Sequence, residues 1–345
     1  MANKINISNG STVGKPIHCK AAIGREAGQP LVIEEVIVAP PKAHEVRIKI
    51  LCTSLCHSDI TFWKLKDPPG CYPRIFGHEA VGIVESVGEG VDELEEGDYV
   101  VPVFIADCGE CKDCKSTESN LCSKFPFKVS PWMPREETSR FTDLNGETLF
   151  HFLFISSFSQ YTVVDVAHLT KLDPSIPPER ACLLSCGIST GIGAASRVAN
   201  VKPGSSVAIF GMGAIGLAVA EGARLCGATR IIAIDVNPEK YEIGKKFGVT
   251  DFINPKTCKD KTVSQARHPW YKKHMLPVES GKSLLGCLFG GLKAKVDVPI
   301  LAKRYMDKEV QLDDFVTHEM KFDEINKAFE LLMEGKCLRC VLWMD

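Results

Sequence analysis

The chain has 345 residues, of which 45% are hydrophobic and 24% charged, the balance of an ordinary folded protein long enough for two domains. Its formal net charge of -2 shows no excess of either sign, so we expect no binding to nucleic acid or to a membrane surface. It has no apolar run of about 18 residues, no signal core and no retention or peroxisomal signal. We therefore expect a cytoplasmic protein that acts on small molecules.

The first half of the chain reads as short strands separated by turns. Period-two apolar patterning with intervening Gly and Pro occurs in "LVIEEVIVAPP", "EVRIKILCTSL", "AVGIVESVG", "DYVVPVF" and "QYTVVD". This pattern predicts a β-rich domain over residues 1–187.

Three potential metal ligands lie in or at the end of this region. They are Cys56 in "LCTSLCHSDITFW", His78 in "YPRIFGHEAVGIVESVG" and Cys186 in "CLLSCGISTGIG". A single Cys is usually a small buried residue and a single His a satisfied polar one. Their interpretation therefore depends on the rest of the sequence.

A cluster of four cysteines follows in the polar segment "CGECKDCKSTESNLC". Its spacing is C-x2-C-x2-C-x7-C, formed by Cys108, Cys111, Cys114 and Cys122. Four thiolates complete the tetrahedral shell of a structural zinc, which would hold together a lobe with few apolar residues. Iron-sulfur ligation is an alternative, although its fourth cysteine usually follows after three residues and a proline. A disulfide-linked loop is conceivable outside the cytosol.

A dinucleotide-binding pattern occupies the segment "SSVAIFGMGAIGLAVAEGARLCGATRIIAIDVNPEK". A strand leads into Gly211, Gly213 and Gly216 as G-x-G-x-x-G, a helix follows, and a second strand ends at Asp235. The glycines permit a tight turn and close approach of a pyrophosphate to the helix N-terminus. Asp235 would bind the ribose hydroxyls and repel a 2'-phosphate, which favours NAD over NADP. An α/β unit without a ligand is the alternative.

The dinucleotide-binding domain is expected over residues 188–288. This part of the chain is too short for the complete sheet of such a domain. After the predicted strand "DFIN", only "SLLGCLF" is apolar enough for another strand, and 28 residues separate Asn254 from Ser283. Two further strands with their helices need about 45 residues. We therefore expect an incomplete cofactor domain, truncated around residues 257–282. His268 and His274 in this stretch are too isolated to predict a metal site.

The end of the chain, residues 289–345, is expected to return to the first domain. It contains the helical pattern of "FDEINKAFELLMEG" and the strand "CVLWM".

Several of these segments together resemble the zinc-containing medium-chain alcohol dehydrogenases, especially the plant alcohol dehydrogenase-like group. The resemblance rests on the four-cysteine lobe and on "SLCHSDITFWK", "PRIFGHEAVGIVESVGEGV", "LLSCGISTGIGAA", "GMGAIGLA" and "GKCLRCVLWM", in that order. It covers residues from about 18 to 264 and from about 280 to the end. It implies a GroES-like catalytic domain, a Rossmann-type doubly wound parallel sheet and a homodimer. "SLLGCLF" resembles the strand that pairs across that dimer.

The resemblance also implies a reaction. Cys56, His78 and Cys186 would bind a catalytic zinc, the second zinc of each subunit. The metal would make an alcohol acidic enough to form an alkoxide, and hydride would pass from a primary or secondary alcohol to NAD. Two alternatives remain: a shortened zinc-binding product with little dehydrogenase activity, or a related enzyme acting on hydroxymethyl-glutathione or polyols.

Further site residues follow from the resemblance alone. Ser58 would begin a proton relay, Asp59 would orient the histidine ligand and Glu79 would lie behind the metal. Expected cofactor contacts are His57, Thr190, Ile215, Lys240 and Arg339. Taken alone, each is better read as a surface residue or, for Asp59, a helix cap.

The sequence departs from the family pattern at two of these positions. His57 stands where many members carry an arginine against the pyrophosphate, so that contact is expected to be weaker and dependent on pH. Thr61 stands where many carry the histidine that ends the relay, so water is expected to take the last step.

Overall fold

The computed structural model describes residues 12–257 and 283–344, and it divides the chain into two compact units. Unit 1 consists of Met1–Cys186, Lys293–Lys308 and Phe315–Asp345, and unit 2 of Gly187–Leu292 and Glu309–Asp314. His268 and His274 lie outside the described residues.

Unit 1 contains two sheets. The first has the order β4-β1-β2-β7-β8 and antiparallel pairing, with the strands β1 Ile17–Gly24, β2 Val32–Val38, β4 Arg74–Ile75, β7 Phe141–Asp143 and β8 Thr148–Leu149. The second has the order β10-β6-β5-β3-β15-β14, and β9 also pairs with β3. Its strands are β3 Glu45–Ser54, β5 Glu79–Val87, β6 Tyr99–Pro102, β9 Tyr161–Asp165, β10 Leu169–Lys171, β14 Val316–Lys321 and β15 Arg339–Trp343. These elements confirm the strands predicted from the sequence.

The helices of unit 1 are short and lie around these sheets. They are α1 His57–Trp63, α2 Lys112–Lys115, α3 Pro178–Ala181, α7 Ala294–Met306 and α8 Ile325–Met333, with the 3-10 turns η1 Val166–His168, η2 Cys182–Ser185 and η9 Phe322–Glu324. The predicted helix near the chain end is thus confirmed as η9 followed by α8.

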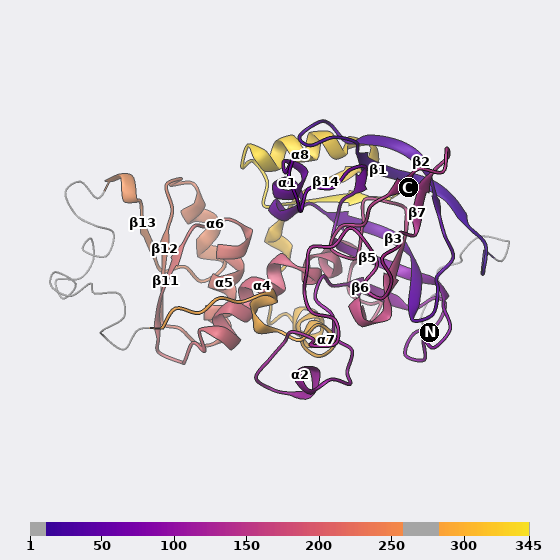
Figure 1. Cartoon of the computed structure of the whole chain (residues 1–345). Helices are drawn as coiled ribbons and strands as arrows, with labels where there is room; N and C mark the ends of the chain where they lie inside the picture. The colour runs from indigo at the N-terminus through magenta and orange to yellow at the C-terminus, as the bar shows by residue number, and fades with distance from the viewer. Residues whose placement is uncertain (1–11, 258–282, 345) are drawn as a thin grey trace. The chain divides into compact units, whose positions relative to one another are not determined.

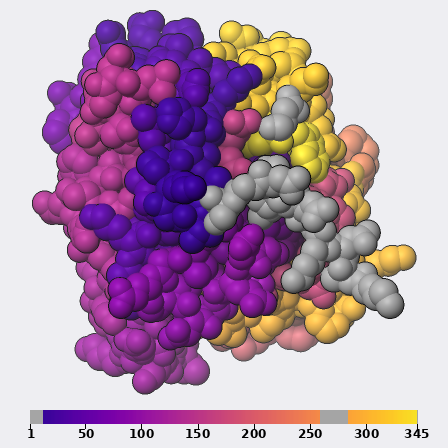
Figure 2. All heavy atoms as spheres, turned by 90° about the vertical axis from the view of Figure 1, so that its right-hand side faces the viewer, coloured from indigo at the N-terminus to yellow at the C-terminus, as the bar shows by residue number. Residues whose placement is uncertain are grey.

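The end of the chain is built into the second sheet. β15 pairs antiparallel with β3, where Val341 lies opposite Ser54, and parallel with β14. Asn326 of α8 bonds both backbone groups of Leu31, from the start of the chain. Figures 1 and 2 show the yellow C-terminal segment beside the indigo N-terminal segment of this unit. Residues separated by most of the chain can therefore share one site.

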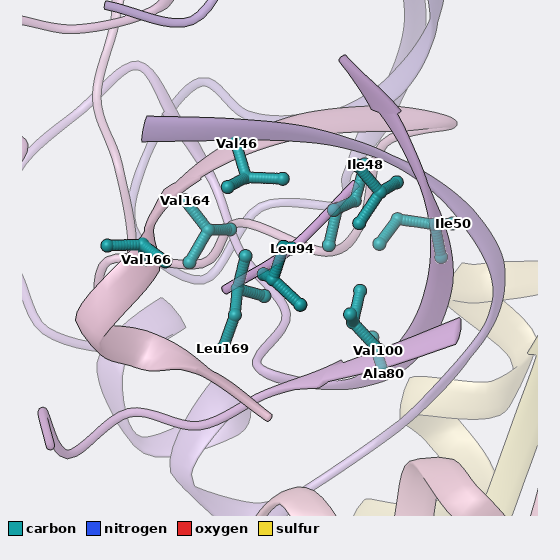
Figure 3. Packing of buried hydrophobic residues seen from close by; sticks show 10 residues of the cluster. Val46, Ile48, Ile50, Ala80, Leu94, Val100, Val164, Val166 and Leu169 are labelled. Carbon is teal, nitrogen blue, oxygen red and sulfur yellow. The ribbon is translucent and has the colours of Figure 1, made fainter. Parts of the chain in front are cut away.

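The core of the second sheet is aliphatic. Figure 3 shows Val46, Ile48 and Ile50 of β3 facing Val100, Leu94 and Val164, all of them buried. β3 and β5 are buried along almost their whole length, and their β-branched residues suit this close packing within the sheet. This packing holds β3 and β5 in place, and the segments that carry Cys56 and His78 lie at their ends.

Unit 2 contains a parallel sheet of three described strands in the order β11-β12-β13. These are β11 Ser206–Phe210, β12 Arg230–Ile234 and β13 Asp251–Ile253, and they are joined by α5 Ala214–Leu225 and α6 Lys240–Lys246. The unit also contains α4 Gly187–Gly193, the π-helix η3 Ala194–Val198 and the 3-10 turns η4 Pro255–Thr257 and η7 Phe289–Gly291. The expected α/β class, a β-rich unit with a separate parallel sheet, is confirmed.

One predicted strand is wrong. Residues 283–288 form no strand, and the short turn η7 begins at Phe289. Leu284 is 100% and Leu285 64% exposed. A strand is stable only when its N–H and C=O groups pair with a neighbour, and no described strand offers one to this segment.

In the described part of the chain, no single helix is long and apolar enough to cross a membrane. The helical segments Pro178–Ser185 and Gly187–Val198 reach the required length and apolar composition only when they are counted together, and the chain bends between them.

Candidate metal centres and dinucleotide site

Three of the predicted ligands meet in unit 1. One ligand atom from each of Cys56, His78, Glu79 and Cys186 lies within 4.8 Å of the others, and all four residues are buried. Cys56 is the N-cap of α1, His78 directly precedes β5, and Cys186 directly follows η2. The fold thus brings together residues that are separated by up to 130 positions in the sequence.

Asp59 fixes the orientation of His78. From the first turn of α1, its Oδ1 lies 3.0 Å from Nδ1 of His78 and accepts from the backbone N–H of Gly77. Its Oδ2 accepts from the backbone N–H of Cys56 at 2.9 Å. Because a carboxylate only accepts, Nδ1 carries a proton, which leaves Nε2 as the ring nitrogen available to a metal. That Nε2 is buried without a hydrogen-bond partner among the described residues.

A hydrogen bond joins the thiols of Cys56 and Cys186. Their mutual hydrogen bond holds the pKa of Cys56 well below its usual value and raises the pKa of Cys186 well above it. A site that already favours one thiolate is prepared for a cation. Two sulfurs and one imidazole nitrogen fit Zn²⁺ and leave its fourth coordination position open, as in catalytic zinc sites. The buried, unpartnered Nε2 is the strongest sign of that fit.

Glu79 pairs with Arg339 behind these ligands. Oε1 lies 3.0 Å from Nη2 of Arg339 and Oε2 lies 2.9 Å from its Nε. Burial raises the pKa of Glu79 to about 7, against the opposing effect of the guanidinium. The structure therefore places Arg339 against Glu79, and its expected pyrophosphate contact stays a prediction.

Two aromatic rings beside His78 were missed by the sequence analysis. Phe104 and Phe152 approach the imidazole edge-on, with centroid distances of 6.4 and 5.7 Å. Both are buried, and they make this side of the cluster apolar. No spacing rule connects them to His78 in the sequence, because β-sheet packing alone brings them there.

Ser58, His57 and Thr61, the other residues of α1 considered in the sequence, differ in exposure and in hydrogen bonding. Ser58 is half-buried, with its Oγ 3.8 Å from the sulfur of Cys56. His57 is exposed, and its carbonyl accepts a hydrogen bond from Thr61 Oγ1 at 2.9 Å. The Thr61 hydroxyl is therefore engaged with its own helix.

The four-cysteine cluster forms a second centre. The sulfurs of Cys108 and Cys114 are 3.8 Å apart, and those of Cys111 and Cys122 are 3.9 Å apart. Four sulfurs at about 2.3 Å from one zinc would be separated by about 3.8 Å, the edge of that tetrahedron. The distances thus fit a closed structural zinc site. Every described cysteine is free, which argues against the disulfide alternative.

Backbone N–H groups support these sulfurs. Cys111 and Cys114 donate to the preceding ligand sulfurs at 3.4 and 3.3 Å, and Phe125 donates to Cys122 at 3.3 Å. Hydrogen bonds, first from Ser123, lower the pKa of Cys111 to about 5. Lys293, the residue before α7, donates to the carbonyls of Asp113 and Cys114. The lobe is therefore held by hydrogen bonds to its sulfurs, by Lys293 and by a small apolar cluster in which Cys122 packs with Ala106 and Ala167.

The glycine-rich turn of unit 2 has the expected backbone. Gly211 has φ +89°, which favours glycine, and the turn continues to Gly213, the N-cap of α5. A Cβ on Gly216 would lie 1.9 Å from the carbonyl oxygen of Gly211, whereas a Cβ on Gly213 would meet nothing within 4 Å. Gly216 is thus needed for packing, and the space at Gly213 remains open at the helix N-terminus, where a phosphate group fits.

Asp235 stands beside this turn. Its Oδ2 accepts from the backbone N–H of Met212 at 2.7 Å and its Oδ1 from that of Asn237 at 2.8 Å. Ile215 is 43% exposed on the first turn of α5, and Lys240 begins α6. Thr190 lies in α4. The groups expected to bind a dinucleotide thus sit on unit 2, except for His57 and Arg339.

Known proteins share this combination of segments. Residues 42–174 match the family described as "Alcohol dehydrogenase GroES-like domain", and residues 214–273 match "Zinc-binding dehydrogenase". The chain is 58% identical to "Alcohol dehydrogenase-like 7" of Arabidopsis thaliana, with 100% of both chains covered. It is 46% identical to "Alcohol dehydrogenase" of Malus domestica, covering 97% of this chain and 99% of that protein.

A solved structure agrees with this likeness. Benzyl alcohol dehydrogenase from Acinetobacter calcoaceticus has a TM-score of 0.80 at 28% identity, covering 95% of this chain and all of that one. The alignment with the Arabidopsis relative spans 389 positions, which leaves 44 positions without a residue among the 345 of this chain. This chain is therefore shorter within the aligned region than that relative.

Proposed function

This chain belongs to the zinc-containing medium-chain alcohol dehydrogenases, and from that membership we propose that it oxidises a primary or secondary alcohol to an aldehyde or ketone with NAD. The observation that carries the proposal is the buried Nε2 of His78. It has no hydrogen-bond partner in the described chain, is oriented by Asp59, and lies with the thiols of Cys56 and Cys186.

The zinc, when bound, supplies a Lewis acid that makes an alcohol hydroxyl acidic at neutral pH. Cys56, His78 and Cys186 would hold it, and Asp59 keeps the His78 lone pair pointed at it. Phe104 and Phe152 exclude water from one side of His78. The half-buried hydroxyl of Ser58 accepts the substrate proton and passes it to solvent.

The cofactor proposal rests on unit 2. The open space at Gly213 and the free N–H groups of α5 receive the pyrophosphate, and the carboxylate of Asp235 receives the ribose hydroxyls. In this proposal the chain divides into a catalytic part, residues 1–187 with 289–345, and a cofactor part, residues 188–288. These bounds differ from those of the two compact units, because residues 289–292 and Glu309–Asp314 belong to unit 2. The variant Asp235→Ser removes the negative charge and is expected to shift the cofactor preference from NAD towards NADP. An unchanged cofactor preference would show that Asp235 is not part of the site.

The structural proposal is a second zinc per subunit in the four-cysteine lobe. A homodimer in the cytoplasm belongs to the same proposal, and the dimer is what the family resemblance implies. Light scattering of the purified chain measures the assembly directly, and a monomeric mass would contradict it.

A second candidate function is a zinc-binding product with little dehydrogenase activity. It is favoured by the three described strands of the cofactor sheet and by the 44 alignment positions without a residue of this chain. This product would keep both metal sites, because all their ligands belong to unit 1.

One experiment separates the two candidates. The full chain is purified with zinc, zinc per subunit is measured, and NADH absorbance is followed with primary alcohols, polyols and hydroxymethyl-glutathione. The comparison uses Cys56→Ser and, as the matched control, Cys71→Ser, a half-buried cysteine outside both clusters. We expect NADH formation and two zincs for the wild type and Cys71→Ser, and one zinc without NADH for Cys56→Ser. Two zincs without NADH in the wild type would leave only the second candidate.

A further inference from the structure

A cavity of about 220 Å³ lies in unit 1 next to the segment that follows the four-cysteine lobe. None of the seven predicted zinc ligands lines it. A cavity of about 150 Å³ holds benzene in a protein core, so this one has room for a substituted aromatic ring. The lining residues that matter below are Phe104, Phe125, Phe127, Phe154, Lys128 and His168.

Four phenylalanines form much of the wall of the cavity. The rings of Phe104 and Phe127 meet edge-on at 5.7 Å, and Phe154 lies 4.9 Å from the ring of His168. The guanidinium of Arg135 lies over Phe125 at 4.6 Å. Such walls favour a flat aromatic ligand, because ring faces and edges pack on each other in these arrangements.

His168 offers one unshared hydrogen-bond acceptor. His168 is 2% exposed, and its Nδ1 lies 2.9 Å from the carbonyl oxygen of Val103. A carbonyl only accepts, so Nδ1 carries the proton, and burial lowers the pKa of the ring and keeps it neutral. Nε2 then has a lone pair, and no hydrogen bond to it exists among the described residues.

The position of His168 is fixed by its own segment. It ends the 3-10 turn η1, whose N-cap Asp165 accepts from the backbone N–H of Ala167 at 2.9 Å. Asp165 also forms an ion pair with Arg135. The backbone that carries His168 is therefore anchored by the hydrogen bond and the ion pair of Asp165.

Lys128 supplies a positive charge without a partner. It is exposed and makes no ion pair or hydrogen bond in the part of the chain that the structure describes. The neighbouring Lys124, by contrast, is 2.8 Å from a carboxylate oxygen of Glu110. The cavity thus combines aromatic walls, one neutral acceptor and one free ammonium group.

We propose that this cavity is a binding site for an aromatic carboxylate that carries a ring hydroxyl. The hydroxyl donates to Nε2 of His168, the ring packs against the phenylalanines, and the carboxylate pairs with Lys128. The site is separate from the metal ligands, although Phe104 forms part of its wall and also touches His78. Its occupancy goes beyond alcohol oxidation and does not depend on it.

Calorimetric titration of the zinc-loaded full chain tests the proposal with 4-hydroxybenzoate and benzoate as probes. One equivalent of 4-hydroxybenzoate is expected to bind, and benzoate about tenfold more weakly, because it leaves the acceptor of His168 without its hydrogen bond. His168→Phe is expected to make the two affinities equal. Lys128→Gln is expected to weaken both severalfold, and Lys112→Gln, at an exposed lysine that does not line the cavity, to change neither.

The Cys56→Ser variant locates the ligand. Its affinity for 4-hydroxybenzoate is expected to equal that of the wild type; a comparable loss would place the ligand at the catalytic metal and overturn the proposal. Equal wild-type affinities for the two probes, or equal effects of Lys128→Gln and Lys112→Gln, would also overturn it. These comparisons stand even if His168→Phe fails to fold, because none of them uses that variant.

Discussion

Asp59 organises the cluster of Cys56, His78 and Cys186 through its hydrogen bonds. It accepts hydrogen bonds from His78, Gly77 and Cys56, so one carboxylate orders both the imidazole and the backbone around the ligands. Partners of this kind set the tautomer and the orientation of a ligating histidine.

We predict that Asp59→Asn weakens zinc binding at the catalytic centre by about 10-fold to 100-fold, because the amide carries no charge and must turn its NH₂ towards a donor. Competition with a chromogenic chelator measures the loss. The control is Asp67→Asn, an exposed aspartate on the segment that follows α1. Equal zinc release from both variants would show that Asp59 has no special role.

His151 is a buried histidine outside the predicted sites. Burial lowers its pKa from 6.5 to about 3, and its Nε2 accepts from the backbone N–H of Arg140 at 3.1 Å. The unfolded chain therefore takes up the proton first as the pH falls. The stability that this histidine contributes is complete above its unfolded pKa and is lost as the pH falls from there towards its folded pKa.

We predict that wild type loses about 1.4 kcal/mol more than His151→Gln in free energy of unfolding between pH 7.5 and 5.5, since glutamine does not titrate. Urea unfolding at both pH values gives the difference. An exposed-site variant, His18→Gln, is expected to follow the wild type. The same slope for wild type and His151→Gln would rule out the buried neutral state.

At the scale of single elements, two glycines of the turn between β11 and α5 have different surroundings. Gly216 touches the backbone of Gly211, whereas Gly213 borders open space. The same motif therefore contains one glycine whose Cβ position is blocked by backbone and one whose Cβ position is open.

We predict that Gly216→Ala destabilises unit 2 by about 1 to 3 kcal/mol, because its methyl group would overlap a carbonyl oxygen. Gly213→Ala is expected to change stability by less than about 1 kcal/mol yet weaken NADH binding at least tenfold. Thermal unfolding and NADH fluorescence titration give the two quantities. If Gly213→Ala binds NADH like the wild type, the pyrophosphate does not sit at this turn.

Element identity was predictable where local pattern and packing agree. The C-terminal helix α8 buries Ile325, Ala328, Phe329 and Leu332, which share one helical face. β3 and β5 are buried along almost their whole length, so their β-branched and apolar content identified them rather than alternation. The strand expected at Ser283–Phe289 failed because pairing, and not apolar composition, makes a strand.

At the scale of the whole molecule, β11 has an open side. It is an end strand of the described sheet, and Phe210 on it is 75% exposed. Unpaired edges with apolar side chains promote association between chains.

We predict that Phe210→Lys reduces concentration-dependent self-association, because a charge on an edge strand opposes pairing. Analytical ultracentrifugation over a range of concentrations measures it. Leu144→Lys, which replaces a 56% exposed leucine of unit 1, serves as the control. Association that persists in Phe210→Lys and falls in the control would exclude this edge as the contact.

The sequence alone determined the four-cysteine cluster and the glycine-rich turn, and it predicted a structural zinc, a bound dinucleotide and an incomplete cofactor sheet. Each of these is a local pattern, because short spacings force neighbouring residues onto one ion or one turn. Through family resemblance it also indicated Cys56, His78, Cys186 and Asp59 as parts of one site.

Only the tertiary structure decided how that site is arranged. The pairing of Arg339 with Glu79, the aromatic rings beside His78 and the cavity at His168 join residues that are distant in the sequence. Such contacts depend on strand order and on the return of β15 to β3, which no local period encodes. The ligands of a scattered site are therefore recognisable in the sequence, whereas the groups that orient and surround them are fixed only by long-range packing.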